Sequence, residues 1–241
     1  MKLYENVVIG NFLYGLGFAV RSHLSTDAPF PGVVNLLQQT PTDKELGDVL
    51  LTFPGAVRLL EFKMKGARLE KETRRHNALS LALQGANQHL IETSRRVHWY
   101  VEVSAAGEHS PLVSRVVPYL DGFTDSSALS YGGFENLIKQ TALDAVQSDT
   151  VAMHERAKIY LDLIRVTMCD RATGAGGLLI VTGAGGGIHF AQLRDIYDLT
   201  LPDRLWLEKA WKTPELESSP PIFEQQVELE RSRKPDRGLS M

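Results

Sequence analysis

The chain has 241 residues with a formal net charge of −3, and 43% of the residues are hydrophobic. This hydrophobic content is sufficient for a buried core, and the negative net charge argues against broad, charge-driven coating of nucleic acid. The single cysteine, Cys169, excludes an internal disulfide and a cysteine-based zinc site. No apolar run approaches the roughly 20 residues of a membrane span, and the N-terminal sequence lacks the regions of a signal peptide. We therefore expect a cytoplasmic protein without membrane contact.

Apolar residues at helical spacing predict a helix over residues 4–20. Gly15 and Gly17 should weaken the end of this helix or allow close packing against it. The patterns that follow predict strands over 33–39, 48–53 and 57–65, a helix over 72–96 and a strand over 97–103. The order helix, three strands, helix, strand predicts an α/β fold in which helices pack on a mixed sheet.

The second half of the chain is predicted to be mostly helical. We expect a short strand over 113–120, helices over 133–146 and 150–168, and two strands around a glycine turn within 177–193. The glycines at 183 and 185–187 would suit a phosphate-binding loop, but no Gly-Lys-Ser/Thr and no helix follow them, so a hairpin turn is favoured. The resulting regions are a core over 1–105, an extension over 106–211 that completes the domain or mediates assembly, and a polar tail over 212–241.

Three charged residues lie on the predicted hairpin of the core. Because side chains alternate along a strand, Glu61 and Lys63 project from the same face, and an antiparallel return would bring Asp48 beside them. Two carboxylates and a lysine at one point could hold a hard divalent cation and position a water, as phosphodiester hydrolysis requires. The alternative is a structural interaction protein whose hairpin carries only solvated surface charge, with Asp48 as a turn residue.

This motif and the element order resemble the PD-(D/E)XK nuclease superfamily, whose core runs α-β-β-β-α-β. In that superfamily an Asp at the second strand precedes a Glu-x-Lys on the third, as Asp48 precedes Glu61, Phe62 and Lys63 here. The resemblance covers residues 4–103, and Gly47 stands where the superfamily's name has a proline. It implies a restriction-endonuclease-like αβββαβ core with a mixed sheet, extended by a mostly helical C-terminal region with a β-hairpin.

The resemblance also implies a mechanism. Asp48, Glu61 and the main-chain carbonyl of Phe62 would ligate Mg²⁺ or Mn²⁺, and Glu5 would act through a metal-bound water. Lys63 would orient or help deprotonate the attacking water. The implied activity is metal-dependent hydrolysis of phosphodiester bonds, with DNA favoured, in prokaryotic antiviral defence or DNA processing. The alternative is a nuclease-fold subunit that scaffolds or binds nucleic acid in a larger complex without cutting it.

Basic residues adjoin the predicted metal site. Between Arg58 and Arg75, seven basic residues outnumber three acidic ones, a local excess of four positive charges. A branch of the superfamily carries a glutamine on its second helix, where Gln84 and Gln88 are both available. The alternative for this stretch is a solvated loop and first helical turn. The predicted contacts with nucleic acid are Lys65, Arg68, Arg74, Arg75 and Gln84, and the C-terminal half is expected to bind a second copy or a partner protein.

Overall fold

The computed structural model of the protein describes residues 3–24, 30–37, 47–104, 112–123, 132–147, 151–168, 177–182 and 188–193. The chain divides into two compact units, Met1–Asp203 and Arg204–Met241. Every helix and strand named below belongs to the first unit, and the second lies outside the described residues, as does the polar tail predicted over 212–241. Within the described ranges, no helix is both long enough and apolar enough to cross a membrane.

Seven strands of the first unit form one mixed sheet in the order β5-β4-β3-β2-β1-β6-β7. The neighbours β3 and β4 run parallel, and the other neighbouring pairs are antiparallel. The predicted α/β class with a mixed sheet is therefore confirmed. The strands are β1 (Phe30–Leu36), β2 (Val49–Phe53), β3 (Ala56–Met64), β4 (His98–Ser104), β5 (Val113–Pro118), β6 (Gly177–Thr182) and β7 (Ile188–Leu193).

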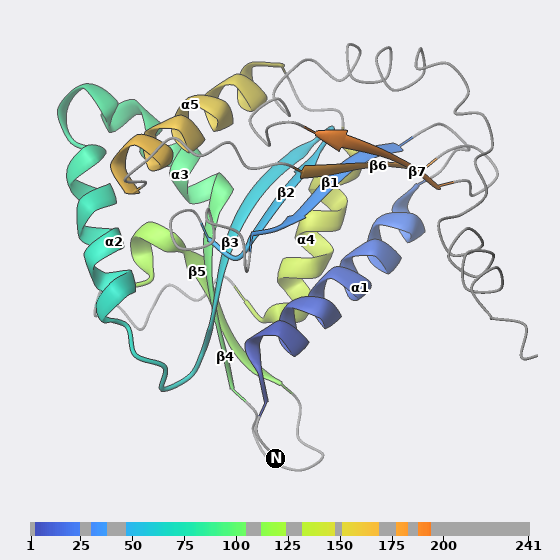
Figure 1. Cartoon of the computed structure of the whole chain (residues 1–241), viewed down its shortest axis with the longest axis horizontal. Coiled ribbons are helices and arrows are strands. Elements are labelled where there is room, and N and C mark those ends of the chain that lie inside the picture. Colours follow the sequence, from blue (N-terminus) through green and yellow to red (C-terminus); the bar gives the residue numbers. More distant parts are fainter. Residues whose placement is uncertain are drawn as a thin grey trace, which may run out of the picture. The chain divides into compact units, whose positions relative to one another are not determined.

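Helices cover both faces of the sheet (Figure 1). On one face α1 and α4 lie side by side, and on the other α2 and α3 pack with α5. The core under α1 is aromatic, because the Phe12 ring contacts those of Phe62 and Phe134 at centroid distances of 5.6 and 5.8 Å. The helices are α1 (Glu5–His23), α2 (Glu70–Ala82), α3 (Ile91–Val97), α4 (Phe134–Val146) and α5 (Val151–Met168), with 3₁₀ turns η1 (Gly85–Leu90) and η2 (Tyr119–Asp121).

One of the two glycines of the first helix, Gly15, allows close packing, which was one of the two predicted outcomes. A Cβ added at Gly15 would lie 3.3 Å from the Ile138 side chain, so this position lets α4 approach α1 closely. The other outcome, a weakened helix end, stays a prediction. The helix continues beyond both glycines to His23 and ends where the Leu24 amide donates to the Arg21 carbonyl at 3.3 Å.

Two predicted elements differ from the structure. The helix expected over 72–96 is divided into α2, η1 and α3, because Gln84 is extended and Gly85 has a φ of +62° in the left-handed region. The first strand begins at Phe30 instead of residue 33, since its early residues pair with β6, with Phe30 opposite Thr182. That partner comes from the second half of the chain, so no local pattern around residue 30 could indicate it.

The other predicted elements are found close to their expected bounds, so the residues up to 104 run helix, three strands, helical segment, strand. The region assigned to an extension adds strands to both ends of this sheet, β5 beside β4 and the hairpin of β6 and β7 beside β1. The glycine turn predicted between β6 and β7, residues 183–187, lies outside the described residues.

The hairpin of β2 and β3 is anchored on α4. Its turn residue Gly55 donates its amide to the Ala145 carbonyl at 3.3 Å, and a Cβ added at Gly55 would lie 2.0 Å from main-chain carbonyl oxygens of the α4 end. Arg58 of β3 is buried and forms an ion pair with Asp144 of α4. These contacts fix the position of the strand that carries Glu61 and Lys63.

Candidate functional site

Asp48 is fixed at the start of β2 by hydrogen bonds to β3. Its amide donates to the Leu60 carbonyl at 2.9 Å, and its carboxylate Oδ2 accepts from the Phe62 amide at 2.6 Å. The register, with Val49 opposite Leu60, extends by one residue to place Asp48 opposite Glu61. Asp48 and Glu61 are both buried. The antiparallel return predicted from the sequence therefore brings these two acids together.

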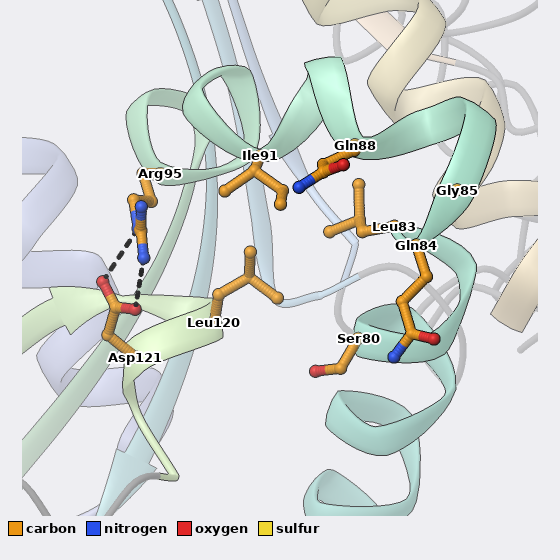
Figure 2. A pocket seen from close by; sticks show the side chains of 9 residues that line it. All are labelled: Ser80, Leu83, Gln84, Gly85, Gln88, Ile91, Arg95, Leu120 and Asp121. Atoms are coloured by element: carbon orange, nitrogen blue, oxygen red, sulfur yellow. Dashed lines mark hydrogen bonds and ion pairs between the residues drawn. The ribbon is translucent and has the colours of Figure 1, made fainter.

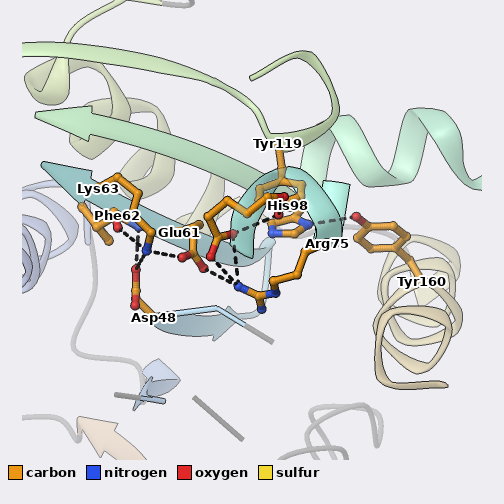
Figure 3. A network of polar contacts seen from close by, with 9 residues as sticks. Asp48, Glu61, Phe62, Lys63, Arg75, His98, Tyr119 and Tyr160 are labelled. Atoms are coloured by element: carbon orange, nitrogen blue, oxygen red, sulfur yellow. Dashed lines mark hydrogen bonds and ion pairs between the residues drawn. The ribbon is translucent and has the colours of Figure 1, made fainter. Parts of the chain in front are cut away.

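The oxygens of this cluster converge on the Lys63 ammonium (Figure 3). The Lys63 Nζ donates to Glu61 Oε1 and, at 3.0 Å, to the Phe62 carbonyl, and it lies 4.0 Å from Asp48 Oδ2. These are the three groups expected to ligate a divalent cation. They surround a single point that is filled by a positive charge belonging to the chain itself.

Burial and charge set the protonation of the two central groups. Burial, and then the charge of Asp48, raise the pKa of Glu61 to about 8, although Lys63 and Arg75 oppose this rise. Burial tends to lower the pKa of Lys63, but the charges of Glu61 and Asp48 outweigh it and raise that pKa. Lys63 therefore stays cationic whether or not Glu61 holds a proton, because Asp48 also acts on it. The charge of Glu5 contributes in the same direction, which places Glu5 within electrostatic reach of Lys63.

A clamp of three further residues holds the other side of Glu61. Arg75 Nη1 of α2 lies 3.4 Å from Glu61 Oε2 and donates to Glu72 at 3.1 and 3.2 Å. The Tyr119 hydroxyl of η2 donates to Glu72 Oε2 at 3.0 Å. Burial opposes ionisation of Glu72, but Arg75, Lys63 and the hydrogen bond from Tyr119 together lower its pKa. Arg75 thus bridges two carboxylates, and its orientation is set by the one that stays ionised.

Behind the clamp, aromatic and polar side chains connect the sheet to α3 and α5 (Figure 3). The His98 ring stacks on the Tyr119 ring at a centroid distance of 4.0 Å and an angle of 3°. His98 Nδ1 lies 3.0 Å from the Tyr160 hydroxyl, which accepts from Ser94 at 2.9 Å. Burial, and then the charge of Arg75, lower the pKa of His98 well below its usual value. A neutral ring therefore supports Tyr119 without adding charge beside Arg75.

Sequence reasoning missed the clamp and assigned Arg75 differently. Arg75 was expected to contact nucleic acid, but its side chain is only 10% exposed and is occupied by two carboxylates. We therefore reassign it to the support of Glu61. The spacing Glu72-x-x-Arg75 on a helix is a signal that could have indicated this pair, because residues three apart lie on one helix face. Lys65, Arg68 and Arg74 are exposed, as contact with nucleic acid would require.

Gln84 does not join the cluster of Asp48 and Glu61 but lines a pocket of about 460 Å³ (Figure 2). Leu83, Ile91 and Leu120 give this pocket an apolar lining. Beside them Arg95 forms an ion pair with Asp121, with Arg95 Nε 3.3 Å from the carboxylate. Both Gln84 and Gln88 line the pocket, whereas none of the cluster residues does. The structure thus separates the glutamines of the second helical segment from the candidate metal site.

The donor set of the cluster consists of hard oxygen ligands, which suit Mg²⁺ or Mn²⁺. Within the described ranges, no group of three or more His, Cys, Asp or Glu side chains is arranged to hold a metal. A metal at the cluster would be held by the carboxylates of Asp48 and Glu61 with the carbonyl of Phe62, and water would complete its shell, as is usual for Mg²⁺. Searches of family models, curated proteins and solved structures found no match to this chain.

Proposed function

We propose that this protein is a divalent-metal-dependent nuclease of the PD-(D/E)XK type that acts on DNA. The observation that carries the proposal is the convergence of Asp48, Glu61 and the Phe62 carbonyl on one point, which the Lys63 ammonium fills. A solvated ion pair on the protein surface would not explain this convergence, since Asp48 and Glu61 are both buried. The element order up to residue 104 and the exposed basic residues after β3 add support.

Each residue of the cluster has a role in this proposal. When bound, the divalent ion supplies charge neutralisation at the phosphate and lowers the pKa of a water molecule, effects worth several kcal/mol. Asp48, Glu61 and the Phe62 carbonyl hold the ion, and Arg75 keeps the Glu61 carboxylate oriented. Lys63 orients the attacking water and offsets negative charge on the phosphorus. Lys65, Arg68 and Arg74 bind the backbone phosphates of the substrate.

A second candidate function follows from the same geometry. Lys63 and Arg75 already neutralise much of the buried negative charge without a metal. A nuclease-fold subunit that binds nucleic acid but does not cut it would have the same internal ion pairs. The two functions differ in one measurable property, because the subunit has no need to bind Mg²⁺ or Mn²⁺.

The test combines cleavage with metal binding. Labelled single-stranded and duplex DNA is incubated with the protein in Mg²⁺, in Mn²⁺ and in EDTA, and calorimetry measures metal binding separately. We expect cleavage only with metal, loss of cleavage and of metal binding in Asp48→Asn, and loss of cleavage alone in Lys63→Ala. Lys139→Ala, which removes an exposed lysine of α4, is the matched control and should cleave normally.

The outcomes separate the candidates. Cleavage that is equal in the wild type, Asp48→Asn and Lys63→Ala would mean a contaminating nuclease and end the proposal. Binding of DNA without cleavage and without calorimetric metal binding would favour the non-cutting subunit. Metal binding that survives Asp48→Asn would show that the cluster is not the metal site.

A further inference from the structure

The first helix is apolar on two sides. One side packs on the sheet and α4 through its buried residues, Val8, Ile9, Phe12, Leu16 and Val20. The other side carries large apolar residues that are exposed: Tyr4 (57%), Val7 (46%), Tyr14 (80%) and Phe18 (76%). We call these four residues, with the exposed Asn11 between Val7 and Tyr14, the aromatic stripe. A second apolar face of a helix is normally covered by a partner, because each exposed aromatic leaves much apolar surface in water.

The stripe has the spacing of a helix-pairing surface. Val7, Asn11, Tyr14 and Phe18 follow one another at intervals of four, three and four residues, which keeps them on one line along the helix. Tyr4 precedes the helix as its N-cap residue, three residues before Val7. Gly10 and Gly17 lie between them, and a Cβ added at either glycine would meet nothing within 4 Å. Glycine inside a helix costs about 0.5–1 kcal/mol relative to alanine. No neighbouring residue of the chain packs closely at either position, so packing within the chain does not offset this cost. The close approach of a second helix would offset it.

We propose that the aromatic stripe is the interface of a two-fold symmetric dimer, in which α1 pairs antiparallel with α1 of a second copy. In this arrangement Asn11, at the middle of the stripe, lies next to its own copy on the symmetry axis. Residues that precede Asn11 in one helix then pack against residues that follow Asn11 in the partner helix. A polar residue at the centre of such an apolar line fixes the register of the pair.

The exposed area is consistent with a second copy as the occupant. The three aromatic residues expose on the order of 400 Å² per chain, taking about 200 Å² for a fully exposed ring side chain. Two-fold symmetry doubles this to about 800 Å², roughly two-thirds of the 1,200 Å² at which stable interfaces begin. Val7, Asn11 and the surface around the two glycines would supply the remainder.

The full-length protein allows a direct test by sedimentation velocity between about 1 and 100 µM, without nucleic acid or metal, so the result is independent of nuclease activity. We expect a species of twice the 26.8 kDa chain mass for the wild type. The double variant Tyr14→Glu/Phe18→Glu should dissociate at least tenfold more readily. Val166→Glu, at a residue 77% exposed on α5, is the matched control and should stay dimeric.

A cross-linking experiment covers the case in which the double variant does not fold. Asn11→Cys is made in a Cys169→Ser background, so that the chain carries one cysteine, and the protein is oxidised. We expect a covalent dimer from Asn11→Cys and none from Glu92→Cys, at an exposed position on α3. A wild type that remains monomeric at 100 µM, a dimer that persists in a folded double variant, or the absence of the Asn11→Cys cross-link would each overturn the proposal.

Discussion

Replacing Glu61 by glutamine should stabilise the metal-free protein, and by an amount that grows with pH. The folded state raises the pKa of Glu61 from 4.5 to about 8, through burial and the nearby charge of Asp48. The folded protein therefore binds this proton more tightly than the unfolded chain does. Unfolding releases the proton between pH 4.5 and about 8, so stability falls as the pH rises through this window.

The size of the effect follows from the pKa difference. Each unit corresponds to about 1.4 kcal/mol, so ionisable Glu61 lowers the free energy of unfolding by about 3 kcal/mol at pH 7 relative to pH 4. Glutamine resembles the protonated acid in shape and keeps Lys63 and Arg75 beside the charge of Asp48 and Glu72. Glu61→Gln should therefore match the wild type near pH 4.5 and exceed it by about 3 kcal/mol at pH 7.

Urea unfolding at pH 5, 7 and 8.5 in EDTA measures this difference, with Glu92→Gln as the control because Glu92 is exposed. Mg²⁺ should then stabilise the wild type and leave Glu61→Gln unchanged, since only the acid gains a cation. A stability difference between the variant and the wild type that does not vary with pH would refute the reasoning. So would a variant less stable than the wild type at pH 7, which would mean that the ion pairs of Glu61 outweigh its burial.

The remaining predictions concern the hairpin, the lysine and the pH dependence of cleavage. Gly55→Ala should destabilise the fold by about 3 kcal/mol or more in urea unfolding, because its Cβ would lie 2.0 Å from two carbonyl oxygens. Lys63→Met should bind Mg²⁺ in calorimetry at least as tightly as the wild type, because its ammonium no longer fills the site, while cleaving no DNA. At Mg²⁺ concentrations far below saturation, the cleavage rate of the wild type should rise with pH up to about 8, as Glu61 ionises in the metal-free protein, and then level off; a flat profile from pH 6 to 8 under these conditions would contradict the assignment of Glu61.

The cluster of Asp48, Glu61 and Lys63 could be predicted from the sequence because its geometry is local. A short hairpin with a Pro-Gly turn leaves one plausible register, and alternation along β3 then puts Glu61 and Lys63 on the same face. Asp48 follows from the same register. Pairing between residues far apart in the sequence leaves no local pattern. The start of β1 at Phe30, which depends on pairing with β6, was therefore not predicted.

The role of Arg75 shows what a sequence pattern leaves open. Its position among other basic residues indicated a surface for nucleic acid, since charge runs usually face solvent. Its burial depends on how α2 lies across the sheet, which brings it within 3.4 Å of Glu61, and on Tyr119, which comes from a later part of the chain to hold Glu72. Arg68 and Arg74, in the same run, are exposed. Only the packing of α2 distinguishes these arginines.

The charges of the cluster connect its acidity with its proposed affinity for a cation. Among the residues joined by the contacts above, Asp48, Glu61 and Glu72 can carry three negative charges, against the positive charges of Lys63 and Arg75. One negative charge is therefore left over in a buried position, where it is costly. A proton on Glu61 can neutralise it, which is why the pKa of that residue is raised. A divalent cation can neutralise it as well, so the proton and the metal compete for the same carboxylate, and the clamp by Arg75 keeps that carboxylate in place for either of them.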